Sequence, residues 1–167
     1  MAIRAIAMDV DGVLTDGTVS LDEAGRESKR ISFADIMGVA IGRRAGLQFA
    51  LVSGEGGPVL DAIATKLGIA DLYPGCKDKA AAVRDFAVRH DLDLTEVCYI
   101  GDDVNDVPAM QICGLAVAPA GAEGAARAAA ARATARLGGA GAVRELVDSL
   151  LAQRGTEDAE RPTDRSN

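Results

Sequence analysis

The sequence predicts an α/β fold in which helices cover both faces of a central parallel sheet, and three observations point to it. Short apolar runs alternate with amphipathic helical stretches along the chain, as expected of strand–helix–strand units in a parallel sheet. The 167 residues suit one domain with a sizeable core. Two acidic clusters, at residues 9–11 and 102–106, come directly after apolar runs, which places them at the ends of strands.

The elements follow in order along the chain. Apolar runs predict strands at residues 3–8, 48–52, 71–73, 97–100 and 115–118. A hairpin is expected at residues 18–33, because Asp22-Glu23-Ala24-Gly25 has the composition of a tight turn. Helical patterns predict helices at residues 37–45, 59–67, 79–90, 107–113, 121–133 and 142–153.

The domain organisation is expected to be simple. A single domain should occupy residues 1–153, with the hairpin at residues 18–33 as a small flap. Residues 154–167 are polar and charged, and they predict a C-terminal tail that is disordered when alone.

Composition narrows the class of partners. The formal net charge of −7 argues against nucleic acid and anionic membranes, and no apolar run approaches the roughly 20 residues that span a bilayer. Arg4 interrupts an N-terminal run already too short for a signal peptide. The three cysteines have no metal-binding spacing and predict reduced, buried thiols in a cytoplasmic protein. The lone histidine, His90, is expected at the surface, which argues against histidine-based triads and zinc sites.

Asp9 and Asp11 end the first apolar run, two positions apart. At the end of a strand, side chains at i and i+2 point the same way. Both carboxylates can therefore face one site, one as nucleophile and the other as proton donor. Two acids that close an apolar strand are costly without a cation. Together with the second cluster, which contains Asp102 and Asp106, they indicate a hard divalent cation and phosphate chemistry.

Each of these residues also has an ordinary structural alternative. Asp102 and Asp106 follow a strand, where aspartates often cap helices or form turns. Taken alone, Ser53-Gly54 is typical of a turn, and Lys79 is typical of a solvated lysine at the start of a helix. Only their combination, in this order along the chain, favours a functional site.

Taken in chain order, Asp9/Asp11, Ser53, Lys79 and Asp102/Asp106 resemble the four motifs of the haloacid dehalogenase (HAD) superfamily of phosphohydrolases. Further segments resemble one small subfamily, the phosphatases of 3-deoxy-D-manno-octulosonate 8-phosphate and of nonulosonate (KDN or sialic acid) 9-phosphates. These segments are the hairpin, Asp9-Val10-Asp11-Gly12-Val13-Leu14-Thr15-Asp16-Gly17, Tyr73-Pro74-Gly75, Gly101-Asp102-Asp103 and Gly138-Gly139-Ala140-Gly141-Ala142-Val143-Arg144-Glu145. The resemblance covers about residues 3–152. It implies a three-layer, Rossmann-like HAD fold with the hairpin as a flap and no large cap domain.

The resemblance implies a role for each strand-end acid. Asp9 would attack phosphorus and form an aspartyl-phosphate. Asp11 would protonate the leaving sugar oxygen and then activate water for the second step. Mg²⁺ would be held by Asp9, the backbone carbonyl of Asp11 and Asp102, and it would screen the repulsion between carboxylate and phosphate.

The resemblance also implies the groups that bind phosphate. The Ser53 hydroxyl and the N–H groups near Gly54 would hold phosphate oxygens. Lys79 would balance the charge of the transferring phosphoryl oxygens. Asp106 would hold a metal-bound water or orient Lys79. Asp103 would contact the residues that bind the metal, without binding it directly.

Two departures from the subfamily bear on the substrate. The octulosonate phosphatases usually carry arginine after the Ser-Gly pair, where it can meet a substrate carboxylate, and this chain has Glu55. A glutamate at this position is similar to the nonulosonate phosphatases. In those proteins an arginine about one helix-length later accompanies the glutamate, and this chain has Ile63 at the corresponding position. Asp35 is expected to point into the entrance of the site. Ile36, where the family usually has glycine, is expected to make that entrance narrower. Glu55 and Asp35 are therefore candidates for substrate selectivity, with a surface Glu55 that touches no substrate as the alternative.

The predicted function is the Mg²⁺-dependent removal of phosphate from a small 2-keto-3-deoxy sugar acid phosphate. The segment between Asp16 and Ser53 is too short for a full α/β cap. The subfamily covers its sites by packing hairpins together in a homotetramer, which the resemblance implies here. Two alternatives stay open: a low-selectivity sugar phosphatase, and a non-catalytic oligomerising module of the kind that accompanies some sialic-acid cytidylyltransferases. The complete set of motif residues favours an enzyme.

Overall fold

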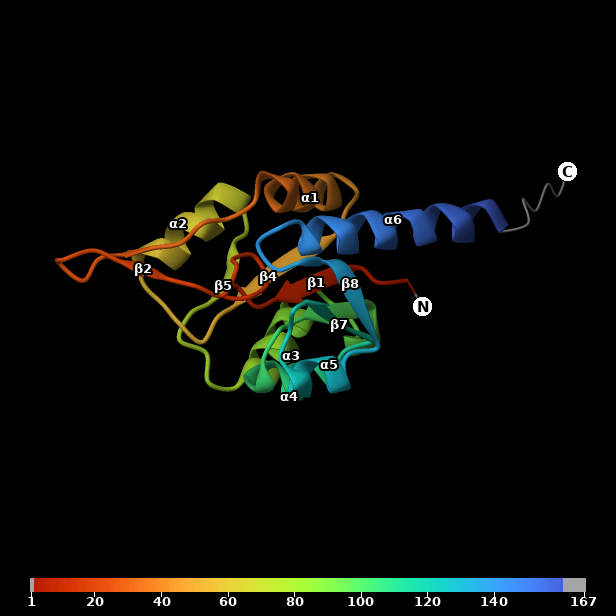
Figure 1. Ribbon diagram of the computed structural model, residues 1–167. Coiled ribbons are helices and arrows are strands. Elements are labelled where there is room, and N and C mark those ends of the chain that lie inside the picture. The colour runs from red at the N-terminus through yellow and green to blue at the C-terminus, as the bar shows by residue number, and fades with distance from the viewer. Residues whose placement is uncertain (1, 161–167) are drawn as a thin grey trace, which may run out of the picture.

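The structure, a computed structural model, describes residues 2–160. Six strands form one parallel sheet in the order β5-β4-β1-β6-β7-β8. Their bounds are β1 Ala5–Met8, β4 Gln48–Val52, β5 Asp71–Tyr73, β6 Val97–Ile100, β7 Leu115–Ala120 and β8 Arg132–Leu137. Helices lie above and below the sheet (Figure 1), so the predicted α/β fold class is confirmed.

Each face of the sheet carries its own set of helices. One face is covered by α1 Phe33–Arg44, α2 Pro58–Leu67 and α6 Ala142–Glu160. The other is covered by α3 Lys79–Arg89, α4 Val107–Met110 and α5 Gly124–Ala129. Two short 3₁₀ helices, η1 Leu94–Glu96 and η2 Val104–Asp106, flank β6. Among the described residues, no helix is both long and apolar enough to cross a membrane.

The central strand β1 shows how the sequence divides the core between the two faces. Ile6 and Met8 pack with the α1, α2 and α6 side, whereas Ala5 and Ala7 pack with the α3, α4 and α5 side. All four are fully buried, because successive side chains of a strand point to opposite faces and helices cover both.

The order of the strands places the carboxyl ends of β1 and β6 at a topological switch point. From β1 the chain moves outward through β4 to β5, then returns across the sheet to β6 and moves outward again. The last residues of the two strands, Met8 and Ile100, lie side by side in register. In open α/β sheets, ligands bind at the carboxyl ends of the strands where the order reverses. The two acidic clusters follow directly from these two ends.

The predicted hairpin is present, although its paired part is short. Strands β2 Ser20–Leu21 and β3 Glu27–Ser28 are antiparallel. The Asp22 carboxylate closes the turn by accepting hydrogen bonds from the N–H groups of Ala24 and Arg26, both at 2.9 Å. Figure 1 shows this hairpin projecting from the body of the molecule at the left.

The prediction of one helix at residues 121–133 is wrong. Helix α5 ends at Ala129, and the chain then forms the edge strand β8. Repeated alanines favour helix by intrinsic propensity. An edge strand that pairs only with β7 and buries only Thr134 needs few apolar residues. It therefore lacks the alternation that identifies a strand from sequence.

The last helix also ends later than the predicted helix at residues 142–153. Helix α6 continues to Glu160, so residues 154–160 are helical. Gly155 does not interrupt the helix, and the surrounding residues include good helix formers such as glutamate, alanine and arginine. The remaining tail residues, 161–167, lie outside the described residues.

Candidate active site

The predicted acid and lysine residues meet at the carboxyl edge of the sheet. Asp9 follows β1, Lys79 opens α3, and Asp106 ends η2. The Nζ atom of Lys79 lies 2.8 Å from Oδ2 of Asp9 and 2.7 Å from Oδ1 of Asp106. All three side chains are buried. Burying one ammonium between two carboxylates leaves a net negative charge in a region with little water.

Asp106 holds several groups of this site together. Its Oδ1 atom accepts hydrogen bonds from Lys79 and from the Tyr99 hydroxyl, both at 2.7 Å. Its Oδ2 atom accepts from the backbone N–H groups of Asp102 at 2.9 Å and Asp103 at 3.1 Å. These contacts orient Lys79, which is one of the two roles predicted for Asp106.

Tyr99 is a site residue that the sequence analysis missed. It is fully buried in β6, and burial is the main cause that raises the pKa of its hydroxyl far above the usual range, with the charge of Asp106 second. A tyrosine inside a buried apolar strand needs a partner for its hydroxyl. This requirement could have indicated from the sequence that Tyr99 has a polar partner, but it could not have identified that partner as Asp106.

The electrostatics of the acids favour a cation. Burial, and then the charge of Asp106, raises the pKa of Asp9 to about 7, while Lys79 opposes the shift. Burial, followed by the charges of Asp106 and Asp103, raises the pKa of Asp102 to about 6. Carboxylate oxygens of Asp9, Asp102 and Asp106 lie within 4.8 Å of one another. A divalent cation suits this donor set, because Mg²⁺ prefers oxygen ligands and would offset the repulsion that raises these pKa values.

A glycine allows the two strand ends to approach closely. A Cβ atom at Gly12 would lie 1.9 Å from Oδ2 of Asp102, and its φ of +80° is one that L side chains rarely adopt. The Asp9-Val10-Asp11-Gly12 turn therefore fits beneath the Asp102 carboxylate only with glycine at this position.

Asp11 has a different environment from Asp9. Its carboxylate is partly exposed and pairs with Lys29 of the hairpin segment, with Nζ to Oδ1 at 2.8 Å. Thr15 donates a longer hydrogen bond to the same oxygen at 3.4 Å. Lys29 was not predicted from the sequence, because nothing in the local sequence distinguishes it from the neighbouring hairpin cations Arg26 and Arg30.

Ser53 and Gly54 lie in the loop that follows β4, the neighbour of β1. Ser53 is buried, and its Oγ atom accepts a hydrogen bond from the Glu55 N–H at 3.1 Å, which leaves its hydroxyl proton available to a ligand. A Cβ atom at Gly54 would lie 3.8 Å from Nδ2 of Asn105, so this loop faces the segment after β6. The Glu55 residue is exposed.

The prediction that Asp35 points into the entrance of the site is wrong. Asp35 is fully buried in the first turn of α1. Its carboxylate accepts hydrogen bonds at 3.0 Å from the N–H groups of Gly141 and Arg144. Burial raises the pKa of Asp35, and these backbone hydrogen bonds oppose the shift. The start of α6 has N–H groups without helical partners, and Asp35 satisfies two donors there instead of meeting substrate.

We expect Asp35→Ala to lower stability without changing substrate affinity. The loss of two buried hydrogen bonds should lower the free energy of unfolding by about 2–3 kcal/mol, measured by chemical denaturation, while KM stays unchanged. Asp61→Ala, in the exposed first turn of α2, is the matched control; it removes a favourable charge near the helix N-terminus, so it should cost less than about 1 kcal/mol and leave KM unchanged. A raised KM with unchanged stability would restore Asp35 as a substrate contact.

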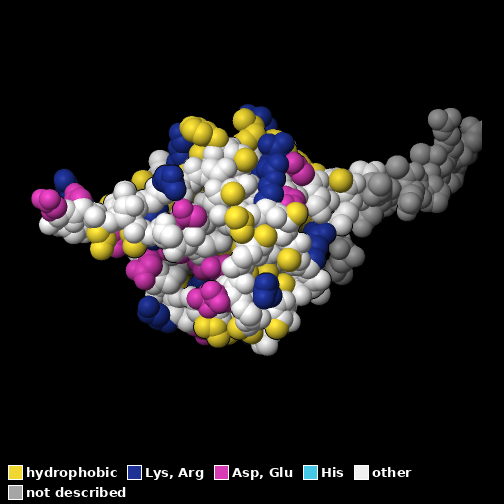
Figure 2. All heavy atoms as spheres, viewed as in Figure 1, with side chains coloured by type: hydrophobic (Ala, Val, Ile, Leu, Met, Phe, Trp, Pro, Cys, Tyr) yellow, Lys and Arg dark blue, Asp and Glu magenta, His cyan; other side chains and the backbone are white. Residues whose placement is uncertain are grey.

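A polar depression of about 380 Å³ adjoins the acid cluster. Its charged lining residues are Asp16, Asp102, Asp103 and Glu123. Figure 2 shows acidic side chains gathered below the base of the hairpin, on the side of the lower helices. The opening beside the candidate site is therefore strongly acidic in the absence of a cation.

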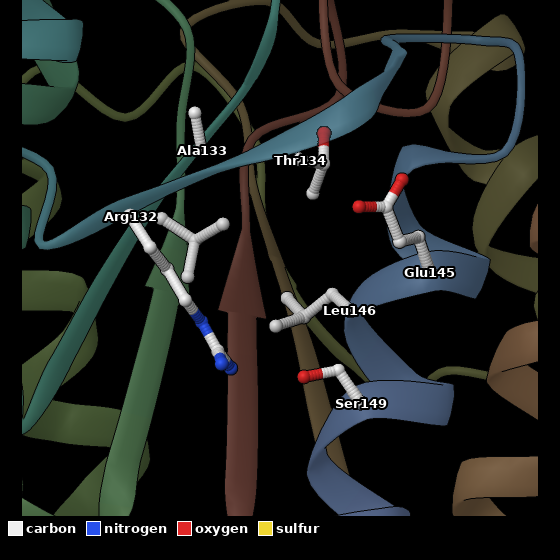
Figure 3. Close-up of a pocket in the computed structure, with 7 residues that line it drawn as sticks. Arg132, Ala133, Thr134, Glu145, Leu146 and Ser149 are labelled. Atoms are coloured by element: carbon white, nitrogen blue, oxygen red, sulfur yellow. The ribbon is translucent and has the colours of Figure 1, made fainter.

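A separate pocket of about 190 Å³ lies between β8 and α6 (Figure 3). Its polar lining residues are Arg132, Thr134, Glu145 and Ser149. The two Glu145 oxygens accept hydrogen bonds at 2.9 Å from the N–H groups of Ala135 and Arg136. Glu145 thereby attaches α6 to the edge strand. None of the predicted site residues lines this pocket.

Known proteins show where this chain belongs. Residues 49–141 match the family of haloacid dehalogenase-like hydrolases. Over 156 residues the chain is 35% identical to the 3-deoxy-D-manno-octulosonate 8-phosphate phosphatase KdsC of Escherichia coli K12, covering 93% of this chain and 83% of that protein. The chain belongs to the haloacid dehalogenase-like hydrolases.

Solved structures of haloacid dehalogenase-like hydrolases agree with this assignment. The octulosonate 8-phosphate phosphatase of Moraxella catarrhalis, in complex with magnesium ion, phosphate ion and KDO, has a TM-score of 0.89 at 31% identity, covering 94% of this chain and 90% of that one. The cobalt-bound phosphatase of Haemophilus influenzae has a TM-score of 0.88 at 33% identity, covering 95% and 93%. The predicted superfamily and enzyme class, a phosphoric monoester hydrolase of the HAD type, are confirmed.

Proposed function

We propose that this chain is a Mg²⁺-dependent phosphatase of a 2-keto-3-deoxy sugar acid phosphate. The observation that carries the proposal is the buried group at the sheet edge, in which Lys79 lies between Asp9 and Asp106 beside Asp102. This arrangement offers a nucleophile, a balancing cation and a set of oxygen ligands at one point. The likeness to octulosonate phosphatases supports the class of substrate.

In the first step, Asp9 is the nucleophile. One of its oxygens attacks phosphorus, and the bond from phosphorus to the sugar oxygen breaks with its electron pair moving to that oxygen. Asp11 gives the sugar oxygen its proton. Lys79 and the Ser53 loop hold the phosphoryl oxygens during the transfer.

In the second step, Asp11 acts as a base. It takes a proton from water, the water oxygen attacks phosphorus, and the bond to Asp9 breaks with its electron pair returning to the carboxylate. Asp9, Asp102 and the Asp11 backbone carbonyl would hold Mg²⁺, which would supply charge that offsets the repulsion between the Asp9 carboxylate and phosphate. Asp106 and Tyr99 keep Lys79 in place.

We expect Mg²⁺ to stabilise the protein more at pH 8 than at pH 5. In the folded, metal-free protein the pKa of Asp9 is about 7 and that of Asp102 about 6, both above the ordinary value of 3.8. The folded state therefore holds more protons than the unfolded state between these values, and metal-free stability falls as pH rises through 4 to 7. Mg²⁺ binds the deprotonated carboxylates and removes their repulsion, so its effect grows over the same range.

Thermal unfolding with Mg²⁺ or with chelator across this pH range tests the expectation. Asp102→Asn should flatten the Mg²⁺ effect, whereas KCl of equal ionic strength should leave the wild-type curve unchanged. A shift in Tm that is equal at both pH values would contradict a carboxylate site with raised pKa values.

The substrate itself is tested by phosphate release from octulosonate 8-phosphate and from nonulosonate 9-phosphates, measured side by side with Mg²⁺. A preference of about a hundredfold in kcat/KM, or roughly 2.7 kcal/mol in the transition state, would name the sugar acid. If Glu55 selects the substrate, Glu55→Gln should reduce that preference. Slow and similar turnover of both would favour a low-selectivity sugar phosphatase, whereas no turnover of any phosphate ester would favour a non-catalytic module.

We also propose that the chain assembles through its hairpin into a homotetramer. The hairpin and the start of α1 expose apolar side chains, with exposed fractions of 65% for Leu21 and 81% for Phe33. Large apolar side chains that are exposed in two neighbouring segments of the chain favour a protein interface. Light scattering that gives one chain, near 17.1 kDa, would contradict this assembly.

A further inference from the structure

Lys29 connects the hairpin with the candidate acid, Asp11. It follows β3 directly, yet its Nζ atom lies 2.8 Å from Oδ1 and 2.9 Å from Oδ2 of Asp11. The two residues come from separate parts of the fold, the flap and the end of the central strand. A small displacement of the flap would therefore move a charge away from Asp11.

The Lys29–Asp11 ion pair differs from the other ion pairs of the hairpin because the Lys29 side chain is largely buried. The side chain of Lys29 is 10% exposed, whereas Arg26 and Arg30 are 82% and 92% exposed in their pairs with Asp22 and Asp16. Exposed pairs contribute little because water screens them. An ammonium that has lost most of its water requires a charged partner, and Asp11 is the partner here.

Two groups together fix the Asp11 carboxylate. Lys29 contacts both of its oxygens, and the Thr15 hydroxyl donates to Oδ1. Thr15 is in turn held by the N–H groups of Gly12 and Gly17, at 3.3 and 3.2 Å. The body of the protein supplies one support and the hairpin the other, and only the hairpin supplies positive charge.

We propose that Lys29 is a positioning residue through which the hairpin sets the orientation of Asp11. This role rests on the proposed phosphatase function, in which Asp11 gives a proton to the leaving sugar oxygen and is left as a carboxylate. The contacts of Lys29 with both oxygens, together with the Thr15 hydroxyl, hold the Asp11 side chain in one orientation toward the site. The flap thus supports the chemistry in a fold whose described residues, 2–160, include no large cap domain.

Dependence on the leaving group tests the proposal. A sugar oxygen needs a proton as its bond to phosphorus breaks, whereas p-nitrophenolate leaves readily without one. General acid catalysis contributes about 10²–10⁴-fold. We therefore expect Lys29→Met to lower kcat/KM for the sugar acid phosphate by about thirtyfold or more, and for p-nitrophenyl phosphate by less than about threefold. The ratio kcat/KM reports only the steps through transfer to Asp9, which excludes the later water step.

Two further variants complete the experiment. Lys29→Arg keeps the positive charge and should recover most of the loss on the sugar substrate. Arg26→Met removes a hairpin cation that does not contact Asp11, and it should match wild type on both substrates. Unfolding curves confirm that each variant is folded before its rates are compared.

The possible outcomes separate the two proposals. Equal losses on both substrates would overturn the positioning role and would indicate direct phosphate binding or a structural effect. If neither substrate shows a loss, the positioning role is also overturned. If the wild-type protein hydrolyses neither substrate, the proposed phosphatase function itself fails, and that result is visible before any variant is made.

Discussion

Asp9→Asn should abolish phosphate release while leaving the fold intact. An amide oxygen is a poor nucleophile, so we expect turnover to fall by at least about a thousandfold. The Asp9 side chain is almost fully buried at the end of β1, and asparagine has nearly the same size, so packing is retained. Phosphate release measured on freshly purified protein, before any deamidation restores aspartate, checks the rate.

Acid-quenched reactions with ³²P-labelled substrate provide a second measurement. Wild-type protein should carry a label that hydroxylamine removes, as expected of an aspartyl-phosphate, and Asp9→Asn should carry none. Asp61→Asn makes the same chemical change on the exposed face of α2 and should behave as wild type. An active Asp9→Asn protein whose sequence is verified by mass spectrometry would rule out the aspartyl-phosphate mechanism.

Lys79→Met should reduce both activity and stability. Lys79 is 2% exposed and lies within 2.8 Å of Asp9 and 2.7 Å of Asp106, so its removal leaves two buried carboxylates without their cation. Removing one partner of a buried ion pair typically costs about 3–5 kcal/mol. We expect a loss of this size in the free energy of unfolding at pH 8, measured in urea without metal.

The pH dependence distinguishes this electrostatic cause from a packing defect. Lys79 lowers the pKa of Asp9, so in the variant Asp9 takes up its proton at higher pH. At pH 5 Asp9 is protonated in both proteins, and the stability gap should narrow. Lys77→Met, an exposed lysine two positions earlier, should show no gap at either pH. A gap that stays constant with pH would indicate lost packing instead.

Much of the fold was predictable because apolar runs and helical patterns recur at the spacing of an α/β sheet. The strands β1, β4, β5 and β6 lie where apolar runs predicted them. The edge strand β8 was missed because a strand with one neighbour and mostly exposed side chains needs little apolar sequence. The end of α6 was placed too early, because polar composition alone does not stop a helix.

Some residues of the site were also predictable from the sequence, and others were not. Asp9, Lys79, Asp102 and Asp106 were predicted from strand and helix ends, and the structure brings them together because parallel strands deliver their carboxyl ends to one edge. Asp35 was misplaced, because its partners at the start of α6 are distant in sequence.

The sequence by itself therefore determined the α/β class, the edge at which the site lies, and the acids that carry its charge. These features depend on local periodicity and on residues that directly follow strands. Only the tertiary structure decided that Asp35 supports α6, that Tyr99 and Lys79 share Asp106, and that Lys29 reaches Asp11. Each of these contacts joins segments from different elements, and its partner is set by how buried polar groups satisfy one another across the packed elements.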